Sequence, residues 1–371
     1  MRSRLSLFRA VFAGASALAV LAATGGPAVA DATRNRQWYL SALDVAEAHR
    51  VTRGDGVTVA LIDTGVDAGH RDLAGAVLAG EDLYEYPEGD GSGRYDLLGH
   101  GTHMAGIIAA RGHGNTDGIL GLAPAATILP VRAINSGFGN SDTIAKAINY
   151  AVAHHASVIN MSFGGSDDTY LHDAIREAQA ADVVLVAAAG NRGAAGDNYP
   201  GKYPEVLTVG ADDQNGNVAT LSVRGPQVDL VAPGVDIATT GTNSSGYSLG
   251  SGTSEATAVV SGAAALIRAK YPQLSAAEVM HRLTATATDA GPAGRDDTYG
   301  YGRLNLIAAL TANVPIQATA STSARPDGGA APPLNSDASS SRTGPAVAAI
   351  AGAVAFLIGL AVIVRRRNRA R

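Results

Sequence analysis

Short apolar runs alternate along the chain with stretches whose apolar residues recur at helical spacing. Four runs rich in β-branched and other apolar residues, as expected of strands buried on both faces of a sheet, are residues 57–62, 128–131, 157–160 and 183–186. Between them, residues 142–155 and 167–181 show helical spacing behind N-cap-type residues. This alternation predicts an α/β fold with a mainly parallel central sheet and helices on both faces.

Ser275 begins another predicted helix. With Glu278 it forms a capping-box pattern, and the helix is expected to continue to about residue 287. Active sites of parallel α/β sheets lie beyond the carboxyl ends of the strands, so polar residues that directly follow a predicted strand are candidates for chemistry. Asp63, directly after the run 57–62, is such a residue.

Residues 1–30 have the pattern of a secretory signal peptide. Arginines precede an apolar run at residues 10–23, and small residues follow it up to Ala30. We expect cleavage after Ala30. The alternative, an uncleaved anchor, is disfavoured because the apolar run is shorter than the ~20 residues of a membrane span.

The other end has the pattern of a membrane anchor. Residues 346–364 carry no charge, and the basic tail 365–371 follows at once. A helix of this length crosses a bilayer, and the arginines favour the cytoplasmic side. Residues 313–345 are rich in Ala, Ser, Pro and Gly, which is typical of a flexible stalk. We therefore expect a single-pass protein of the cell membrane, with an extracytoplasmic domain at residues 31–312 and a cytoplasmic C-terminus.

The chain of 371 residues has no cysteine and a formal net charge of −5. The absence of thiols excludes cysteine catalysis, disulfides and cysteine-based metal sites. The only strong basic cluster is the tail, so the chain lacks an electrostatic footprint for nucleic acid. We expect no nucleic-acid partner.

Three segments supply an acid, an imidazole and a hydroxyl: IDTGVD at residues 62–67, GHGTHMAG at 99–106 and SGTS at 251–254. Acyl transfer needs a nucleophile, a base with a pKa near neutrality and a buried carboxylate that orients the base. A serine at a helix start can also direct its backbone N–H at the developing oxyanion. Asp63, His100 and Ser254 are therefore the candidate catalytic residues.

Each segment alone has a simpler interpretation. A serine after Gly-Thr is more often a helix N-cap, and an aspartate at a strand end is usually a turn residue. His100 and His103 could form half of a metal site, but no added helix supplies a carboxylate ligand. Only the three segments together, in the order Asp, His, Ser, favour catalysis.

In this order and wording the segments resemble the subtilase family of serine proteases. The likeness extends through nearly all of residues 37–312. Further matching segments are VINMSFGG at 158–165, VAAAGN at 186–191, YPGKYP at 199–204 and VAPG at 231–234. The resemblance implies a subtilisin-like three-layer fold and serine endopeptidase activity.

The resemblance also implies roles for single residues. Asp63 would orient the imidazole, His100 would act as general base and acid, and Ser254 would be the nucleophile. Asn191 matches the family's oxyanion-hole asparagine, whose side-chain amide acts together with the Ser254 backbone N–H.

Substrate contacts are implied in the same way. Ser162, Phe163 and Gly164 resemble the edge strand that pairs with the substrate backbone, and Ser136 and Gly137 would belong to the opposite edge. An extended peptide held between two edges is a form of β-augmentation. We therefore expect an unfolded protein or an exposed loop as the substrate.

The expected specificity pocket departs from the family pattern. Asn198 stands where many relatives have glycine at the pocket floor, directly before Tyr199-Pro200, which matches a family cis-proline. Arg192 follows the oxyanion asparagine. One interpretation is a narrower, more polar pocket whose rim, through Arg192, accepts acidic residues before the scissile bond. The alternative is that Arg192 is a solvated surface residue.

A second departure follows the predicted nucleophile. Glu255 and Ala258 stand where most relatives have Met and Pro. A carboxylate near His100 would stabilise the protonated ring and raise its pKa. The alternative is that Glu255 points to solvent or pairs with a local cation.

Residues 111–118 replace a family loop that often holds calcium. Asp72, Asn115 and Asp117 are oxygen donors there, but the loop differs in length from that of the relatives. We expect no metal and no cofactor, with calcium as the alternative.

The stalk, the anchor and Gln37-Trp38 before the first helix resemble the mycosins, which are membrane-anchored subtilases associated with type VII secretion. Mycosins usually contain cysteines, which this chain lacks. The resemblance implies processing of exported proteins near the membrane, with a secretion complex as partner. One alternative is a scaffold of such a complex whose proteolysis is dispensable. Another is a hydrolase of small esters, which the peptide-edge segment 162–164 disfavours.

Overall fold

The computed structural model describes residues 33–84, 89–114, 117–135, 139–194 and 197–315. The chain divides into two units, Met1–Gln317 and Ala318–Arg371, and all described residues belong to the first. The predicted signal peptide, membrane helix, basic tail and nearly all of the predicted stalk lie outside the described residues. Among the helices that are described, none has both the length and the apolar character of a membrane span.

Seven strands form the central sheet, in the spatial order β2-β5-β1-β6-β7-β8-β9. Every adjacent pair runs parallel. Apart from the short edge strand β2, the strands are almost entirely buried, because helices cover both faces. The strands are β1 (Thr58–Asp63), β2 (Glu81–Asp82), β5 (Thr127–Arg132), β6 (Val158–Met161), β7 (Val184–Ala188), β8 (Leu207–Asp212) and β9 (Leu230–Pro233).

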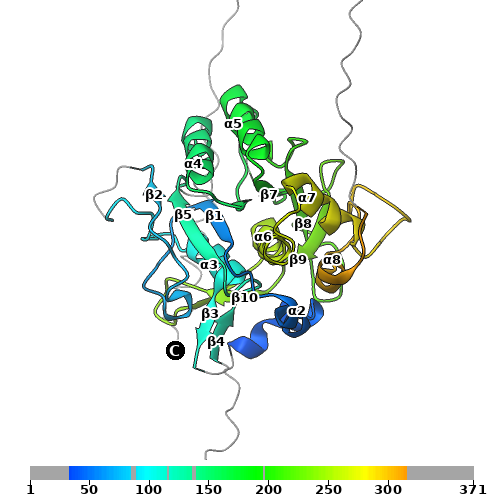
Figure 1. The fold of residues 1–371 in the computed structure, drawn as a ribbon, viewed down its shortest axis with the longest axis horizontal. Helices are drawn as coiled ribbons and strands as arrows, with labels where there is room; N and C mark the ends of the chain where they lie inside the picture. The colour runs from blue at the N-terminus through cyan, green and yellow to red at the C-terminus, as the bar shows by residue number, and fades with distance from the viewer. Residues whose placement is uncertain (1–32, 85–88, 115–116, 136–138, 195–196, 316–371) are drawn as a thin grey trace, which may run out of the picture. The chain divides into compact units, whose positions relative to one another are not determined.

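Helices pack on both sides of the sheet, as Figure 1 shows. On one side, α4 (Ser141–Ala153) and α5 (Thr169–Ala180) lie against each other and against β1, β5 and β7. On the other side, α3 (His100–Ala109) and α6 (Thr253–Lys270) pack together, with α6 against β6 to β9. Each side has its own apolar core. The predicted α/β fold with a mainly parallel sheet is confirmed.

The shorter helices surround this framework. The Ser275 side chain accepts a hydrogen bond from the Glu278 N–H, and the Glu278 carboxylate accepts one from the Ser275 N–H at 2.6 Å, so the predicted capping box is confirmed. The remaining helices are α1 (Trp38–Ala42), α2 (Val45–Val51), α7 (Ala276–Ala285) and α8 (Leu306–Thr311), with 3-10 turns η1 (Arg34–Arg36) and η2 (Arg71–Leu73).

Two antiparallel pairs that the apolar pattern does not predict are β3 (Arg111–His113) with β4 (Asp117–Leu120), and β10 (Ile237–Thr240) with β11 (Tyr247–Gly250). The β10–β11 pair holds the helix α3. The Thr239 hydroxyl donates to the His103 carbonyl at 2.7 Å, and the Thr240 hydroxyl donates to the Thr102 carbonyl at 2.6 Å. Both bonds anchor the first turn of the helix that begins with His100.

The helix α6 is buried from Glu255 to Arg268, which makes it the central helix of the fold. Small residues occupy most of its positions and allow close packing. At Gly262, for example, an added Cβ would lie only 2.6 Å from the Leu122 Cβ. A helix without a polar face belongs in a core. The position of Ser254 on its first turn is therefore set by the packing of the whole domain.

Candidate active site

Asp63 and His100 meet at the carboxyl edge of the sheet. Asp63 is the last residue of β1, and His100 is the first of α3. The first turn of α3 packs closely against the turn after β1, because a Cβ on Gly101 would lie only 2.0 Å from the Gly65 carbonyl oxygen. His100 Nδ1 lies 2.7 Å from Asp63 Oδ1. Because a carboxylate can only accept, Nδ1 donates here, and Nε2 is left for another partner.

The two partners differ in their access to water. The Asp63 side chain is 1% exposed, whereas that of His100 is 37% exposed. Burial lowers the pKa of His100. The Asp63 carboxylate raises it through its charge and its hydrogen bond, and the charges of Glu255 and Asp96 raise it further. The net result is a pKa of about 9. Water screens part of this attraction because the ring is partly exposed. Because its pKa lies above neutrality, the protonated ring is favoured at neutral pH.

Asp96, which the sequence analysis did not single out, ties the two segments together. It is 5% exposed and accepts five hydrogen bonds. The Thr64 hydroxyl donates at 2.9 Å, and the Thr102 N–H and hydroxyl donate at 2.8 and 2.7 Å. Thr64 in turn accepts from the Gly101 N–H at 2.9 Å. The signal that could have found Asp96 is an acidic residue just ahead of a helix start.

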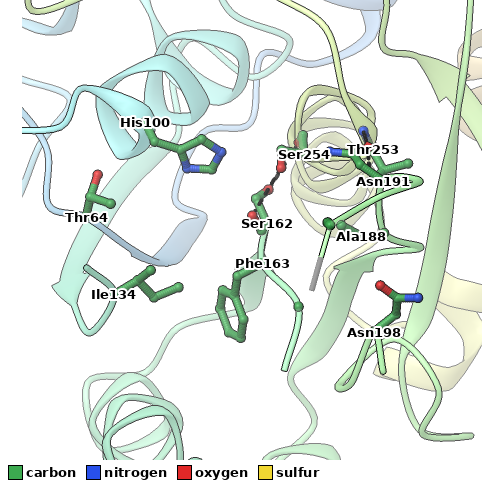
Figure 2. Close-up of a pocket in the computed structure, with 13 residues that line it drawn as sticks. Thr64, His100, Ile134, Ser162, Phe163, Ala188, Asn191, Asn198, Thr253 and Ser254 are labelled. Atoms are coloured by element: carbon green, nitrogen blue, oxygen red, sulfur yellow. Dashed lines mark hydrogen bonds between the residues drawn. The ribbon is translucent and has the colours of Figure 1, made fainter. Parts of the chain in front are cut away.

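Ser254 lies on the first turn of α6, across the cavity from His100 (Figure 2). Its hydroxyl donates to the Ser162 carbonyl at 3.1 Å. In the described part of the chain no hydrogen bond joins this hydroxyl to His100, in contrast to the expected row of carboxylate, imidazole and hydroxyl. The side-chain torsion of a serine has three staggered positions, and the present one points the hydroxyl at the segment that follows β6. Hydrogen bonds of this kind are often looser without substrate.

Buried polar residues fix the relation between α6 and the end of β6. The Ser162 hydroxyl accepts from Asn160 Nδ2 at 2.9 Å and donates to the Ser254 carbonyl at 3.1 Å. Asn160 Oδ1 accepts from the Ser261 hydroxyl at 2.9 Å. Asn160 is completely buried in β6 and was not predicted as a site residue. A buried amide of this kind must be hydrogen-bonded, so it holds the two elements in one register.

Asn191 lies beside the start of α6. Its Oδ1 accepts from the Thr253 N–H and hydroxyl, both at 3.1 Å. Because these are donors, the oxygen must face them, and the NH2 group is the part of the amide that remains to donate. Asn191 and Ser254 both line the same cavity.

The cavity has a volume of about 280 Å³ and lies between the sheet edge, α3 and α6. It brings together most of the residues predicted from the sequence. Figure 2 shows Phe163 and Asn198 on the side away from Ser254. The lining residues are Thr64, His100, Ile134, Ser162, Phe163, Gly164, Ala188, Gly190, Asn191, Ala194, Asn198, Thr253 and Ser254.

Among the described residues, one predicted contact residue, Arg192, does not line the cavity. Ser136 and Gly137 lie outside the described residues. Arg192 is exposed, and its Nε donates to the Ser222 carbonyl at 3.3 Å. A substrate contact of Arg192 stays a prediction. The peptide bond between Tyr199 and Pro200 is cis, as the resemblance implied.

Glu255 is buried, with 6% of its surface exposed. The alternative that it points to solvent is therefore wrong. Burial raises the pKa of Glu255, and the charge of His100 opposes this rise. The structure thus places a buried carboxylate next to the predicted nucleophile and within electrostatic range of the predicted base.

Asp72, considered as a calcium ligand, is engaged in bonds within the protein. Its Oδ1 lies 2.6 Å from His113 Nδ1, and its Oδ2 accepts from the Ile119 N–H at 2.8 Å. Asn115 lies outside the described residues.

Burial, followed by the charge of His100, lowers the pKa of His103 to about 4, which keeps that ring neutral. In the part of the chain that the structure describes, no group of three or more His, Asp and Glu side chains is placed to hold a metal ion.

Sequence comparisons connect this geometry to known proteins. A sequence model of the subtilase family matches residues 54–302. Subtilisin DY of Bacillus licheniformis is 42% identical over 266 residues, which cover 69% of this chain and 92% of that protein. Subtilisin Savinase of Lederbergia lenta is 39% identical over 279 residues, which cover 73% of this chain and 97% of that protein.

Solved structures give the same result. A structure of MycP1 with the N-terminal propeptide removed is 33% identical, with a TM-score of 0.67, and the match covers 75% of this chain and 98% of that one. MycP1 from Mycobacterium smegmatis is 30% identical, with a TM-score of 0.65, and the match covers 75% of this chain and 85% of that one. The resemblance to subtilases and mycosins is therefore confirmed. The chain belongs to the subtilase family and is a subtilisin-like serine-type endopeptidase.

Proposed function

We propose that this subtilase is a membrane-anchored extracytoplasmic endopeptidase that processes exported proteins through Asp63, His100 and Ser254. The observation that carries the proposal is the 2.7 Å contact between His100 Nδ1 and Asp63 Oδ1, beside a cavity that both His100 and Ser254 line. A carboxylate, an imidazole and a serine hydroxyl around one cavity are the groups that acyl transfer needs.

The reaction begins with a movement of the nucleophile. The Ser254 hydroxyl leaves the Ser162 carbonyl by rotation of its side chain and turns towards His100. As Oγ attacks the carbonyl carbon of the scissile bond, His100 Nε2 takes its proton, and Asp63 holds and stabilises the imidazolium. The imidazolium then protonates the leaving amine. Water, activated by the same ring, hydrolyses the acyl-enzyme.

Two donors are available for the oxyanion. The Asn191 NH2 group is left to donate, because its carbonyl oxygen faces Thr253. The Ser254 backbone N–H lies in the first turn of α6, where such groups have no partner within the helix. Both belong to residues that line the cavity, so together they can stabilise the charge that develops in the transition state.

The substrate is an extended peptide. Ser162 and Gly164 lie on the segment that follows β6 and line the cavity, so their backbone is placed to pair with a peptide strand. Phe163, also lining the cavity, is buried in the core between the sheet and α4 and α5, which makes this edge rigid. The opposite edge is assigned to Ser136 and Gly137 on the resemblance alone.

The location outside the membrane rests on the two ends of the sequence. Residues 1–30 are proposed as a cleaved signal peptide, 346–364 as the anchor and 365–371 as the cytoplasmic tail. Residues 31–312 form the peptidase domain in this proposal, and the stalk 313–345 keeps it away from the bilayer. The similarity to MycP1, one structure of which is described as coming from the ESX-1 type VII secretion system, supports a secretion complex as partner.

A fluorophosphonate probe tests the chemistry. The full chain should be labelled covalently at Ser254 and should cleave an unfolded protein, whereas Ser254→Ala should show neither reaction. Ser251→Ala is a matched control, because Ser251 lies directly before α6, and its hydroxyl accepts from the Asp236 N–H at 2.9 Å and does not line the cavity. Labelling that persists in Ser254→Ala would contradict the proposed nucleophile.

A second function is favoured by the same structural neighbours. As a relative of a protein from a type VII secretion system, the chain can serve as a structural part of a secretion complex. Export by cells that carry Ser254→Ala separates the two functions. Export that continues with Ser254→Ala but fails when the whole protein is removed supports the scaffold. Export that fails in both cases supports processing.

A further inference from the structure

Glu255 occupies space that two glycines leave open for it. A Cβ on Gly250 would lie 2.1 Å from Glu255 Oε1, and a Cβ on Gly252 would lie 2.8 Å from Glu255 Oε2. Neither glycine has a left-handed backbone conformation; Gly252 has φ 177° and is extended. Backbone freedom therefore does not explain these glycines. The volume of the carboxylate does.

In the described part of the chain no lysine or arginine pairs with this carboxylate, and the cation whose charge acts on it is His100. Apart from its own backbone N–H, the carboxylate has no hydrogen-bond partner in the described part of the chain. Burial of a carboxylate with few partners disfavours its charged form, which is why the pKa of Glu255 is raised. Buried acids with raised pKa values beside a cavity are concentrated at functional sites.

The groups that act on His100 come from each element around it. Asp63 ends β1, Asp96 precedes α3, and Glu255 lies on α6; all three are carboxylates that raise the pKa of His100 against the effect of burial. Among the described residues, His103 on α3 is a further titratable neighbour, and its ring is neutral. The other residues that line the cavity are uncharged. Asp63 and Asp96 are hydrogen-bonded to the segments that they join, whereas Glu255 contributes charge alone.

We propose that Glu255 is a positioning residue that acts through His100: its buried charge stabilises the imidazolium formed when the ring takes the Ser254 proton. This inference rests on the proposed function. Ionised Glu255 makes His100 a stronger base, which favours proton removal from Ser254. It also keeps the ring protonated up to a higher pH, and a protonated ring cannot act as a base. The charge of Glu255 therefore lowers activity at low pH, where His100 stays protonated, and speeds proton removal from Ser254 at high pH.

The rate of fluorophosphonate labelling against pH tests this inference without a peptide substrate. In the full chain, Glu255→Gln should move the rise in labelling to lower pH, by about one unit. The labelling rate at the high-pH plateau should fall. A buried charge is screened little by salt, so the displacement should persist in concentrated salt. Glu177→Gln on the exposed surface of α5 is the matched control, with the same change of net charge and no expected displacement.

The two proposals fail in different ways. If the wild-type chain is not labelled at any pH, the proposed function is overturned and this inference with it. If the wild type is labelled and the rise for Glu255→Gln coincides with that for Glu177→Gln, only the inference is overturned. Should Glu255→Gln fold poorly, the titration of the His100 ring by NMR in Ser254→Ala, with and without Glu255→Met, gives the same answer. A midpoint that Glu255→Met leaves unchanged would overturn the inference.

Discussion

The Asp96 carboxylate accepts a hydrogen bond from the Thr64 hydroxyl at 2.9 Å, and this contact joins the segment that carries Asp63 to the segment that carries His100. Thr64 directly follows Asp63, and its N–H also donates to Asp63 Oδ1 at 2.8 Å. Asp96 therefore holds the acid and the base of the proposed triad in one register, although it does not line the cavity.

Asp96→Asn should weaken both the fold and the reaction. An asparagine amide would turn an NH2 group towards groups that donate to Asp96, and a buried donor without an acceptor costs about 1–3 kcal/mol of stability. The melting temperature should fall, and turnover should fall at an unchanged KM because His100 is less firmly placed. Full activity in a folded Asp96→Asn variant would contradict this role. Asp90→Asn, in an exposed loop, serves as the control.

Removal of the side-chain oxyanion donor should slow the chemical step. Asn191→Ala is expected to lower kcat by about 10²–10³, the loss typical of one such donor, with little change in KM. The loss arises because the amide binds the transition state more strongly than the substrate. A kcat that remains within a few-fold of the wild type would show that the Asn191 amide does not face the oxyanion.

Asn198→Gly should change the substrate preference, because Asn198 is expected to form the floor of the specificity pocket. Asn198 has φ 63°, a conformation that glycine adopts without strain, so the backbone should be retained. Its carboxamide fills the space beside Gly190, where a Cβ would lie 2.0 Å from Asn198 Oδ1. Without it the cavity is larger and less polar. We expect kcat/KM for substrates with a large apolar residue before the scissile bond to rise about tenfold or more, measured with a peptide library. An unchanged profile would place the specificity elsewhere.

The wild-type enzyme should be most active above neutral pH. Only neutral His100 can accept the Ser254 proton, and three carboxylates raise its pKa above the ordinary value of 6.5, to about 9. Activity should therefore rise as pH increases through the raised pKa and fall away below it. The pH dependence of kcat/KM with an uncharged peptide measures this rise. A midpoint at or below the ordinary value would contradict the effect of the carboxylates.

The sequence predicted most of the sheet that positions the site. The strands β1, β5, β6 and β7 lie within one or two residues of the predicted apolar runs, because strands buried on both faces need such runs. The strand β9 is apolar but has only four residues and ends in Pro233, which disfavours a strand prediction. The pair β10–β11 is rich in Thr, Ser and Gly and carries little apolar signal. These elements form because neighbouring elements pair with them.

Most of the residues predicted for the site line one cavity, but not all of their contacts could be predicted. The pairing of Asp63 with His100 could be expected, since a strand end and a helix start in the family order supply both groups. The hydrogen bond from the Ser254 hydroxyl to the Ser162 carbonyl could not be expected, because it depends on a rotation about a single side-chain bond. Asp96 was missed although most of its partners lie within six residues of it, because only the fold shows that Thr64 joins them. Asn160 was missed because its partner Ser261 is distant in sequence.

The burial of α6 has a consequence for how the enzyme would be inactivated. Segments with few apolar contacts open locally, whereas a helix enclosed on all sides is released only when the domain unfolds as a whole. The proposed nucleophile lies at the start of such a helix. Heating or denaturant should therefore abolish proteolysis and hydrogen-exchange protection of α6 in a single transition, without an earlier stage in which a folded domain has lost its active site.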